Sequence, residues 1–413
     1  MTTAEQRELP RMAGRESAFL VETLIFRLVM RRAGVLSLLA ACGLGCSGAD
    51  RPDPASLVHP DRTTTSDIID GIPLPPVTCD DFCGETFLHQ LQTPPNLYFL
   101  VDRSGSMSDL LQGSPLNKYD AARRVLGKLL NVIGYRVRYG ASIFPEFADT
   151  CGAGHEVFAP TVGGLPSCYG SRDPVLTAFL KSFGEYAPGG ATPTAAAIAG
   201  VRSELEQLEG STYLVLLTDG APNCNFDASC GADQCTLNIE GASIGRQQCT
   251  SRFNCCDPGN SGPLAPAECV DADATEQEIA RLAAHGIPTY VVGMPGAGAY
   301  AEVLDRLAVA GGTARDGDTA YYAADDEAAL ERALYAIGTG VAIRCTIELE
   351  TPPDDPDRVN VYFDGQVVPA DSYNGWAWDG DARIVVNGDA CASLESGDVV
   401  DARVVFGCDT VVR

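Results

Sequence analysis

The chain has 413 residues, of which 45% are hydrophobic and 20% are charged. These proportions are typical of a soluble globular protein with a sizeable core, and the length allows two or three domains. The formal net charge of −26 argues against nucleic acid as a partner, because binding to phosphates needs a basic face.

Cysteine and histidine occur in very different numbers, with 16 Cys and 4 His in the chain. The few histidines are scattered, which argues against a His-rich catalytic metal centre. The abundant cysteines predict an oxidising compartment and a framework of disulfides.

The first recognisable segment is MRRAGVLSLLAACGLGC, residues 30–46. Two arginines precede a short apolar stretch and small residues, a pattern that predicts a secretory signal too short to span a bilayer. Residues 39–42, LAAC, resemble the lipobox of bacterial lipoproteins, which implies that Cys42 becomes the lipidated first residue of the mature chain. The alternative is an ordinary signal, with Cys42 or Cys46 in a disulfide.

The position of this segment also predicts how the N-terminal part is organised. Signals begin near the start of a chain, so we expect Met30 to be the true initiator and 1–41 to be the signal region. Residues 42–95 are rich in Pro, Asp, Ser and Thr, as expected of a flexible, lipid-anchored tether. Gly43 follows the lipobox cysteine, and the resemblance then implies an exported lipoprotein of the outer membrane, either periplasmic or surface-exposed.

Strand-like and helix-like segments alternate from 96 to 340. Apolar or alternating runs predict strands over 96–102, 135–144, 156–162, 211–220 and 287–294. Periodic apolar positions predict helices over 119–134, 192–209, 276–286, 301–312 and 325–338. This alternation predicts an α/β fold, a doubly wound and mostly parallel sheet with helices on both faces. The strands 135–144 and 156–162 are expected to pair as a hairpin.

Two further regions are distinguished by their cysteines. Residues 221–270 hold seven and have little periodicity, which predicts a disulfide-stapled insertion, with zinc binding as the alternative. Residues 341–413 hold three cysteines and several short β-branched runs, as expected of a small β domain. Both counts are odd, so if all cysteines are paired each region must send at least one bridge outside itself, and a link between the two is the simplest solution.

Small oxygen-bearing side chains gather where the first strand ends, in NLYFLVDRSGSM. Asp102, Ser104 and Ser106 follow this buried run, and ligands bind beyond the carboxyl ends of such strands. A carboxylate and two hydroxyls suit Mg²⁺, Mn²⁺ or Ca²⁺ better than zinc. Gly105 is expected to permit the tight turn that points both serines inward.

Two later segments add to this set. Thr192 lies in the Gly-rich stretch PGGATPT before a predicted helix, and Asp219 ends the predicted strand in LVLLTDG. Asp102 and Asp219 are therefore expected on one rim of the sheet, with Thr192 reaching across from a neighbouring loop.

In this order, DRSGS, GGATPT and LLTDG resemble the metal-ion-dependent adhesion site of the von Willebrand factor A (VWA) domain, over residues 96–340. The resemblance implies that Ser104 and Ser106 bind Mg²⁺ (or Mn²⁺ or Ca²⁺) directly. It implies that Thr192 binds directly or through water and that Asp102 and Asp219 act largely through waters. A partner protein would then supply an Asp or Glu carboxylate to the metal. The Cys-rich insertion after Asp219 departs from the family pattern.

Other interpretations were weighed against adhesion. Residues 241–245, GASIG, match the G-x-S-x-G motif of hydrolases, but they lie in the insertion and not at a strand–turn–helix elbow. The metal set has no nearby His or Glu as a general base, so an enzyme is not predicted and a metal-assisted hydrolase is the less favoured alternative. A structural envelope lipoprotein, with metal only stabilising the fold, is the other alternative. Trp376 and Trp378 are expected in a small β core more than in an exposed patch.

Overall fold

The computed structural model describes only part of the chain. The described residues are 63–74, 85–87, 94–146, 151–164, 172–184, 186–228, 243–244, 247–248, 252–253, 256–263, 265–342, 345–349, 351–395, 399 and 402–412. The predicted signal, Cys42 and much of the predicted tether lie outside them. So do four of the seven insertion cysteines, namely Cys230, Cys235, Cys249 and Cys255.

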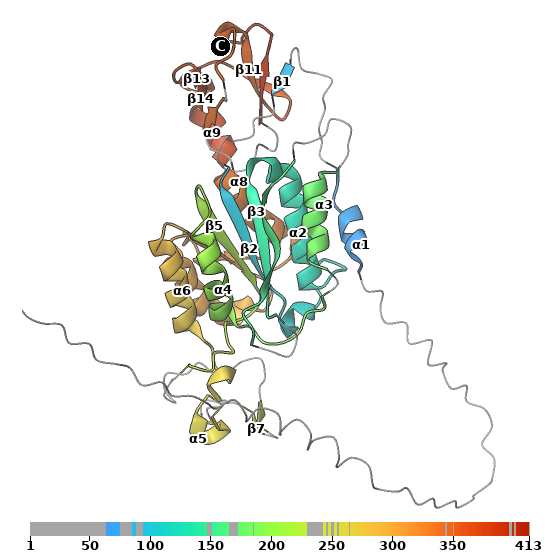
Figure 1. The fold of residues 1–413 in the computed structure, drawn as a ribbon, viewed down its shortest axis with the longest axis vertical. Coiled ribbons are helices and arrows are strands. Elements are labelled where there is room, and N and C mark those ends of the chain that lie inside the picture. Colours follow the sequence, from blue (N-terminus) through green and yellow to red (C-terminus); the bar gives the residue numbers. More distant parts are fainter. Residues whose placement is uncertain are drawn as a thin grey trace, which may run out of the picture. The chain divides into compact units, whose positions relative to one another are not determined.

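The described elements alternate as expected over the central part of the chain (Figure 1). The strands are β1 (Glu85–Phe87), β2 (Asn96–Asp102), β3 (Arg138–Phe144), β4 (His155–Val162), β5 (Thr212–Thr218), β6 (Ser243–Ile244), β7 (Gln247–Gln248), β8 (Thr289–Gly293), β9 (Tyr322–Ala323), β10 (Thr346–Glu348), β11 (Val359–Phe363), β12 (Gln366–Val368), β13 (Trp376–Trp378), β14 (Arg383–Val386) and β15 (Ala402–Phe406). The α-helices are α1 (Thr65–Asp70), α2 (Lys118–Ile133), α3 (Pro174–Ser182), α4 (Thr194–Leu205), α5 (Pro258–Ser261), α6 (Ala272–Ala284), α7 (Ala301–Ala310), α8 (Glu327–Ala342) and α9 (Gly388–Glu395).

A six-stranded sheet in the order β4-β3-β2-β5-β8-β9 forms the centre of this domain. β2 pairs in parallel with β3 and β5, β5 with β8, and β8 with β9. β4 alone runs antiparallel, paired with β3, which confirms the predicted hairpin. The fold is therefore the predicted α/β class, with a mostly parallel sheet.

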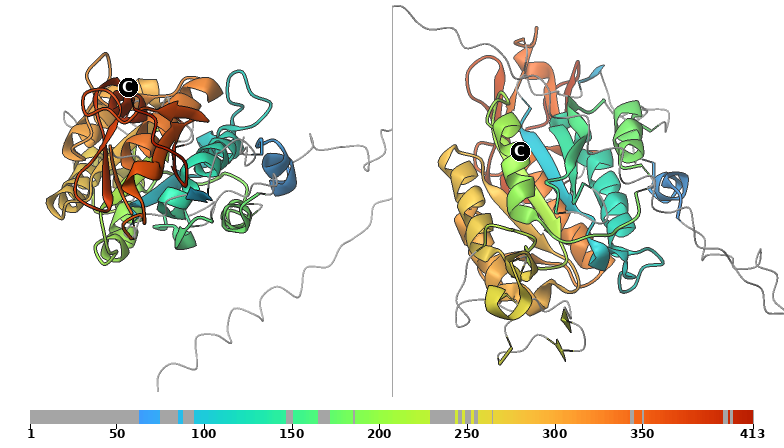
Figure 2. Two further views of the ribbon diagram at one scale, coloured as in Figure 1. Left: turned by 90° about the horizontal axis from the view of Figure 1, so that it is seen from above. Right: turned by 60° about the horizontal axis from the view of Figure 1, so that its bottom comes forward.

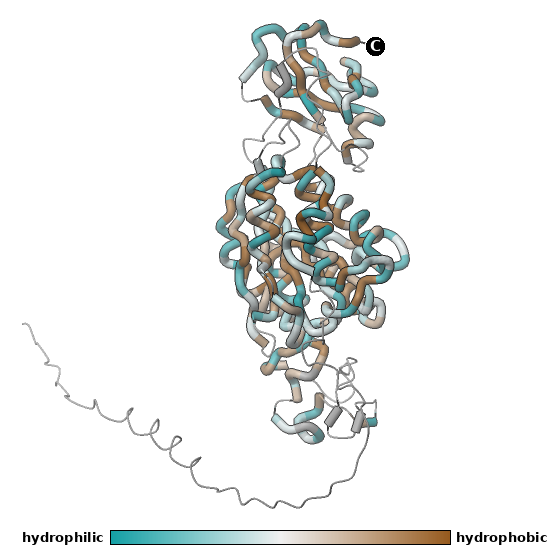
Figure 3. Tube along the Cα trace, turned by 90° about the vertical axis from the view of Figure 1, so that its right-hand side faces the viewer, coloured by the Kyte–Doolittle hydropathy of each residue, from teal (hydrophilic) through white to brown (hydrophobic). Residues whose placement is uncertain are grey.

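The central strand β2 shows why the sheet is covered on both faces. All seven of its residues are buried, and successive side chains of a strand point to opposite faces. Leu97 and Phe99 pack in one apolar cluster with residues of α2, α3 and α8. Tyr98 and Leu100 pack in a second cluster with α4, α6 and α7. Figure 2 shows the helices on both sides of the sheet, and Figure 3 shows hydrophobic and hydrophilic residues alternating along them.

Two described segments differ from the predicted tether. α1 is a short helix capped by Thr64. Ile68 within it and Ile72 just after it are each only 1% exposed. β1 pairs antiparallel with β15 of the C-terminal region. Apolar residues that are isolated in a polar segment can therefore still dock, because tertiary contacts override local composition. Among the described residues, no helix is long and apolar enough to cross a membrane.

The C-terminal region forms the predicted small β structure. One sheet has the order β1-β15-β11-β12 and another the order β10-β14-β13. Trp376 is buried, and its ring meets that of Trp378 edge-on at 5.7 Å between centroids. The tryptophans thus belong to the packed interior, as expected. The helix α8 continues to Ala342, and β10 begins at Thr346.

The described disulfides include one bridge that leaves the insertion. Cys224, in the insertion, is bonded to Cys151 between β3 and β4, and not to the C-terminal region. Cys256–Cys269 lies within the insertion and Cys345–Cys391 within the C-terminal region, while Cys408 is also disulfide-bonded. One bridge therefore joins the insertion to the sheet domain, and the predicted link between the insertion and the C-terminal region stays a prediction. The described insertion cysteines are disulfide partners, which speaks against the zinc alternative for these three.

Candidate metal centre

Asp102 is the last residue of β2, and it organises the turn that carries both serines. One carboxylate oxygen, Oδ1, accepts a hydrogen bond from the backbone N–H of Ser104 at 2.7 Å, and Oδ2 accepts one from Thr218 Oγ1 at 2.7 Å. In turns, an Asp side chain commonly accepts a hydrogen bond from the backbone N–H of the residue two positions later. A 3₁₀ turn follows over Gly105–Ser108, anchored by the buried side chain of Met107. The Oγ atoms of Ser104 and Ser106 lie 3.2 Å apart.

Asp219 follows β5 and joins the same cluster. Its Oδ1 accepts a hydrogen bond from Ser106 Oγ at 2.7 Å. Its Oδ2 accepts one from the ammonium of Lys118 at 2.7 Å. The structure thus brings Asp102, Ser104, Ser106 and Asp219 together at the carboxyl ends of two neighbouring strands, as expected from their places in the sequence.

The loop that carries Thr192 lies against the serine turn. Gly105 N–H donates to the Gly190 carbonyl at 3.0 Å, and Gly189 N–H donates to the Arg103 carbonyl at 2.8 Å. Gly105 does not adopt a left-handed φ, and a Cβ there would lie 3.6 Å from the Gly190 oxygen, an ordinary contact. The expected conformational need for glycine at this position is therefore wrong.

Thr192 itself is held by Asn223, a residue that sequence analysis did not single out. Thr192 N–H donates to Asn223 Oδ1 at 2.8 Å, and Asn223 N–H donates to the Thr192 carbonyl at 2.8 Å. This pair satisfies the Thr192 backbone but not its side chain. Thr192 is fully buried, and its Oγ1 has no hydrogen-bond partner among the described residues.

The electrostatics of the two aspartates differ from an ordinary surface pair. Asp102 is fully buried and Asp219 is 2% exposed. Burial raises the pKa of the Asp102 carboxyl and the negative charge of Asp219 raises that pKa further, whereas hydrogen bonds from Thr218 and Ser104 lower it. The environment thus disfavours the ionised form of Asp102, whose hydrogen-bond donors are neutral, and a nearby cation would stabilise that ionised form.

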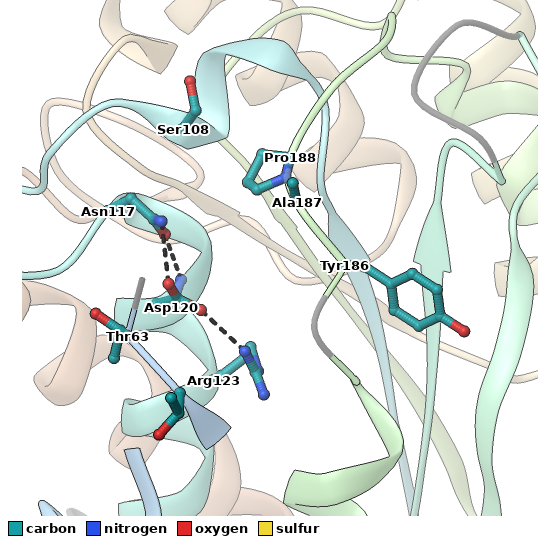
Figure 4. Close-up of a pocket in the computed structure, with 9 residues that line it drawn as sticks. Thr63, Ser108, Asn117, Asp120, Arg123, Tyr186, Ala187 and Pro188 are labelled. Atoms are coloured by element: carbon teal, nitrogen blue, oxygen red, sulfur yellow. Dashed lines mark hydrogen bonds and ion pairs between the residues drawn. The ribbon is translucent and has the colours of Figure 1, made fainter. Parts of the chain in front are cut away.

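A cavity of about 270 Å³ lies beside these loops (Figure 4). Its lining includes Ser108 from the serine turn, Asn117 and Asp120 at the start of α2, and Tyr186 from the loop before Thr192. The Asp120 carboxylate accepts hydrogen bonds from Asn117 and from the guanidinium of Arg123. The cavity wall therefore offers polar groups whose charges are already balanced.

The residues at the rim fit a hard divalent cation. Three hydroxyls and two carboxylates are oxygen donors of the kind that Mg²⁺, Mn²⁺ and Ca²⁺ prefer. Among the described residues, no group of three or more His, Cys, Asp or Glu side chains is placed to hold a metal, so the hydroxyls are essential to this set. The Thr192 hydroxyl supports the fit most directly, because a buried polar group without a partner is unusual.

Comparison with known proteins adds little to this geometry. No family model matches the chain. The uncharacterised protein YwmC of Bacillus subtilis (strain 168) is 26% identical over 172 residues, which cover 40% of this chain and 74% of YwmC.

Several solved structures are similar at low identity. The pilus adhesin SpaC from Lactobacillus rhamnosus GG matches with a TM-score of 0.41 and 16% identity over 76% of this chain and 39% of SpaC. The PilB minor pilin from Streptococcus sanguinis matches with a TM-score of 0.39 and 18% identity over 62% of each chain. The vWF domain of the type V pili tip protein Mfa5 from Porphyromonas gingivalis matches with a TM-score of 0.39 and 10% identity, over 61% of this chain and 97% of that domain. At this level of similarity, none of these likenesses assigns a function to the chain.

Proposed function

We propose that this protein captures a partner protein through a divalent metal ion at the rim of its sheet. Hydroxyl ligands would come from Ser104, Ser106 and Thr192. Asp102 and Asp219 would supply the negative charge that balances the ion. Mg²⁺, Mn²⁺ and Ca²⁺ all suit these donors. Such an ion supplies an electrophilic position for an Asp or Glu carboxylate of the partner.

The buried hydroxyl of Thr192 is the observation that carries this proposal. It lacks a hydrogen-bond partner among the described residues, although its backbone is paired on both sides with Asn223. The Thr192 side chain is also fully buried, so the hydroxyl is not in contact with bulk water. A cation beside the serine turn would satisfy it.

The surface beside the rim suits a macromolecular partner. Leu110, Tyr186 and Phe226 are large hydrophobic residues with exposed fractions of 72%, 46% and 57%. They come from three separate loops, each within a few residues of a predicted metal ligand. Their apolar side chains are thus accessible to a partner that approaches these loops.

The direct test is metal binding followed by partner capture. Isothermal titration should show that the wild-type chain binds Mg²⁺ and that Asp102→Ala binds it at least about tenfold more weakly. Asp409→Ala is the control, because Asp409 is an exposed aspartate of the C-terminal region that contacts none of the predicted metal-site residues. Capture from envelope extract should then require Mg²⁺ and be lost with EDTA or Asp102→Ala, in protein whose melting shows that it remains folded.

The alternatives give different results in the same experiment. If metal only stabilises the structure, EDTA and Asp102→Ala will lower the melting temperature but leave capture unchanged. If the chain is a metal-assisted hydrolase, Mg²⁺-dependent turnover will appear on ester, peptide or phosphoester panels. Capture that persists in excess EDTA contradicts the proposed function for that partner.

We also propose, from the sequence alone, that the protein is anchored in the envelope through a lipid on Cys42. Labelling with a radioactive fatty acid should mark the wild-type chain and leave Cys42→Ser unlabelled, with Cys46→Ser as the matched control. N-terminal mass spectrometry of the native product will show whether it starts at Cys42. A product that begins before Met30, or a label that survives Cys42→Ser, contradicts the anchor.

A further inference from the structure

Lys118 is a buried cation within the candidate metal centre. It is the first residue of α2 and is only 6% exposed. Its Nζ lies 2.7 Å from Asp219 Oδ2 and 3.7 Å from a carboxylate oxygen of Asp109. A Cβ on Gly296 would lie 3.6 Å from the same Nζ, so the loop after β8 packs over the ammonium. Lysine is rarely buried unless it is paired, and here its close partner is a predicted metal-site residue.

The pairing sets the charge of the centre. Among the described residues, Asp219 has an ion pair with Lys118 and Asp102 has none. When both carboxyl groups are ionised, the two carboxylates and the buried ammonium leave a single net negative charge. A divalent cation would change this to a single net positive charge, whereas without Lys118 the same metal would leave the centre neutral.

The second buried cation of the rim, Arg103, is directed elsewhere. Its guanidinium donates to the carbonyl oxygens of Pro145, Glu146 and Ala187. It joins the loops around the centre and makes no ion pair with Asp102 or Asp219. Lys118 is therefore the cation in direct contact with the predicted metal-site carboxylates of the described chain.

We propose that Lys118 is a specificity-determining residue that selects an anionic ligand over a neutral one. Its ammonium competes with the metal for Asp219 and so lowers metal affinity. The same charge keeps the loaded centre positive, so an incoming carboxylate neutralises it and a neutral carbonyl or amide does not. This inference rests on the proposed function, because it concerns the ligand of the same centre.

The two effects of Lys118 have opposite signs, and this makes the inference testable. In Lys118→Met, the full chain should bind Mg²⁺ about tenfold more tightly by titration calorimetry. With Mn²⁺ as the reporter, water-proton relaxation follows displacement of metal-bound water by added acetate, and acetamide serves as the neutral isostere. The wild type should bind acetate in preference to acetamide, and Lys118→Met should lose about tenfold in this preference.

Lys118→Arg is the comparison variant, because it retains the charge: the preference for acetate over acetamide should be kept, even where the larger guanidinium changes the absolute affinities. If Lys118→Met does not fold without metal, Lys118→Gln is measured in the same way. A merely structural role predicts that these substitutions weaken metal and acetate binding together, and that result overturns the inference, as does an unchanged preference. Failure of the wild type to bind Mg²⁺ or Mn²⁺ instead contradicts the proposed function itself.

Discussion

The two halves of the rim hold similar aspartates in different ways. On the β2 half, Asp102 is compensated by neutral donors, the Ser104 N–H and the Thr218 hydroxyl. On the β5 half, Asp219 is compensated by the ammonium of Lys118 and the Ser106 hydroxyl. The charge of Asp219 is therefore paired within the fold, whereas Asp102 has no cationic partner among the described residues.

The halves also differ in how firmly they are attached. The segment after Asp219 is pinned by the Cys151–Cys224 disulfide, and Asn223, next to that bridge, holds Thr192. The serine turn after Asp102 is held by backbone hydrogen bonds and the buried Met107 side chain. The β5 half is therefore a rigid frame against which the serine turn is placed.

The largest expected effect separates the two aspartates. Asp219→Asn leaves the ammonium of Lys118 buried without its close partner, which should lower the free energy of unfolding by about 3–5 kcal/mol in EDTA. Asp102→Asn removes a buried anion that has no cation partner, so it should leave the stability in EDTA unchanged or raise it. Chemical denaturation of both variants in EDTA measures the difference.

Adding metal to the Asp102→Asn and Asp219→Asn variants gives a second test of the difference between the two aspartates. Mg²⁺ should stabilise the wild type more than it stabilises either variant, because each variant has lost one negative charge of the centre. Equal losses of stability in EDTA for the two variants would contradict the assignment of Lys118 to one half alone.

The next prediction tests the Cys151–Cys224 disulfide, which holds the β5 half. The Cys151–Cys224 bridge closes a loop with a sequence separation of 73, so Cys151→Ala/Cys224→Ala should lower the free energy of unfolding by about 2–4 kcal/mol. Because Asn223 precedes Cys224, Mg²⁺ affinity should fall as well. Removing Cys345–Cys391 is the control: it should lower stability and leave metal affinity as it is. If removing either disulfide changed metal affinity equally, the Cys151–Cys224 bridge would have no specific effect on the rim.

A smaller effect is expected at Asn223, the residue that holds Thr192. Asn223→Ala removes the acceptor for the Thr192 N–H and should weaken Mg²⁺ binding about tenfold, as losses of supporting residues at metal sites do. Asn225→Ala is the matched control, because Asn225 Oδ1 accepts from Asp227 N–H and does not contact Thr192. An affinity that is unchanged in Asn223→Ala would show that Thr192 is not a ligand or needs no support.

The sequence predicts much of this arrangement because the relevant signals are local. An apolar run ending in Asp102 and another ending before Asp219 mark adjacent parallel strands, and their carboxyl ends necessarily share a rim. The position of Thr192 is harder to predict from the sequence, because it depends on which loop packs beside the serines. The fold class follows from the same alternation of runs.

The residues that were missed depend on contacts across the chain. In the sequence, Lys118 looks like a solvated residue at a helix start; only the packing of the loops after β5 and β8 makes it a buried partner of Asp219. Asn223 meets Thr192 across 31 positions, and no periodicity signals that pair. Cysteine parity required a bridge out of the insertion but could not identify Cys151 as its end. Ile68 and Ile72 similarly acquire a structural role only through docking.

The smallest expected effect contrasts the rim with an acidic pair that lies outside it. Glu204 on α4 meets Glu156 on β4, and burial together with the hydrogen bond and negative charge of Glu156 raises the pKa of Glu204 to about 7. Unfolding returns this pKa to its ordinary value near 4.5, so the folded state binds more protons between these pH values. Stability from this group is therefore full at low pH and declines as the pH rises through 7.

Glu204→Gln should accordingly raise the melting temperature at pH 8 and leave it nearly unchanged at pH 5. Solvent screens this half-exposed pair, so the gain at pH 8 is a fraction of about 1 kcal/mol, or about 1 °C. Glu206→Gln is the matched control on the same helix end: Glu206 lies within ion-pair distance of Arg202, so its neutralisation should give no gain at pH 8. A Glu204→Gln difference that does not change between the two pH values would mean that the two glutamates do not share a proton. In that case, of the two carboxylate pairs compared, only Asp102 and Asp219 at the rim would repel each other, and there Lys118 offsets the repulsion.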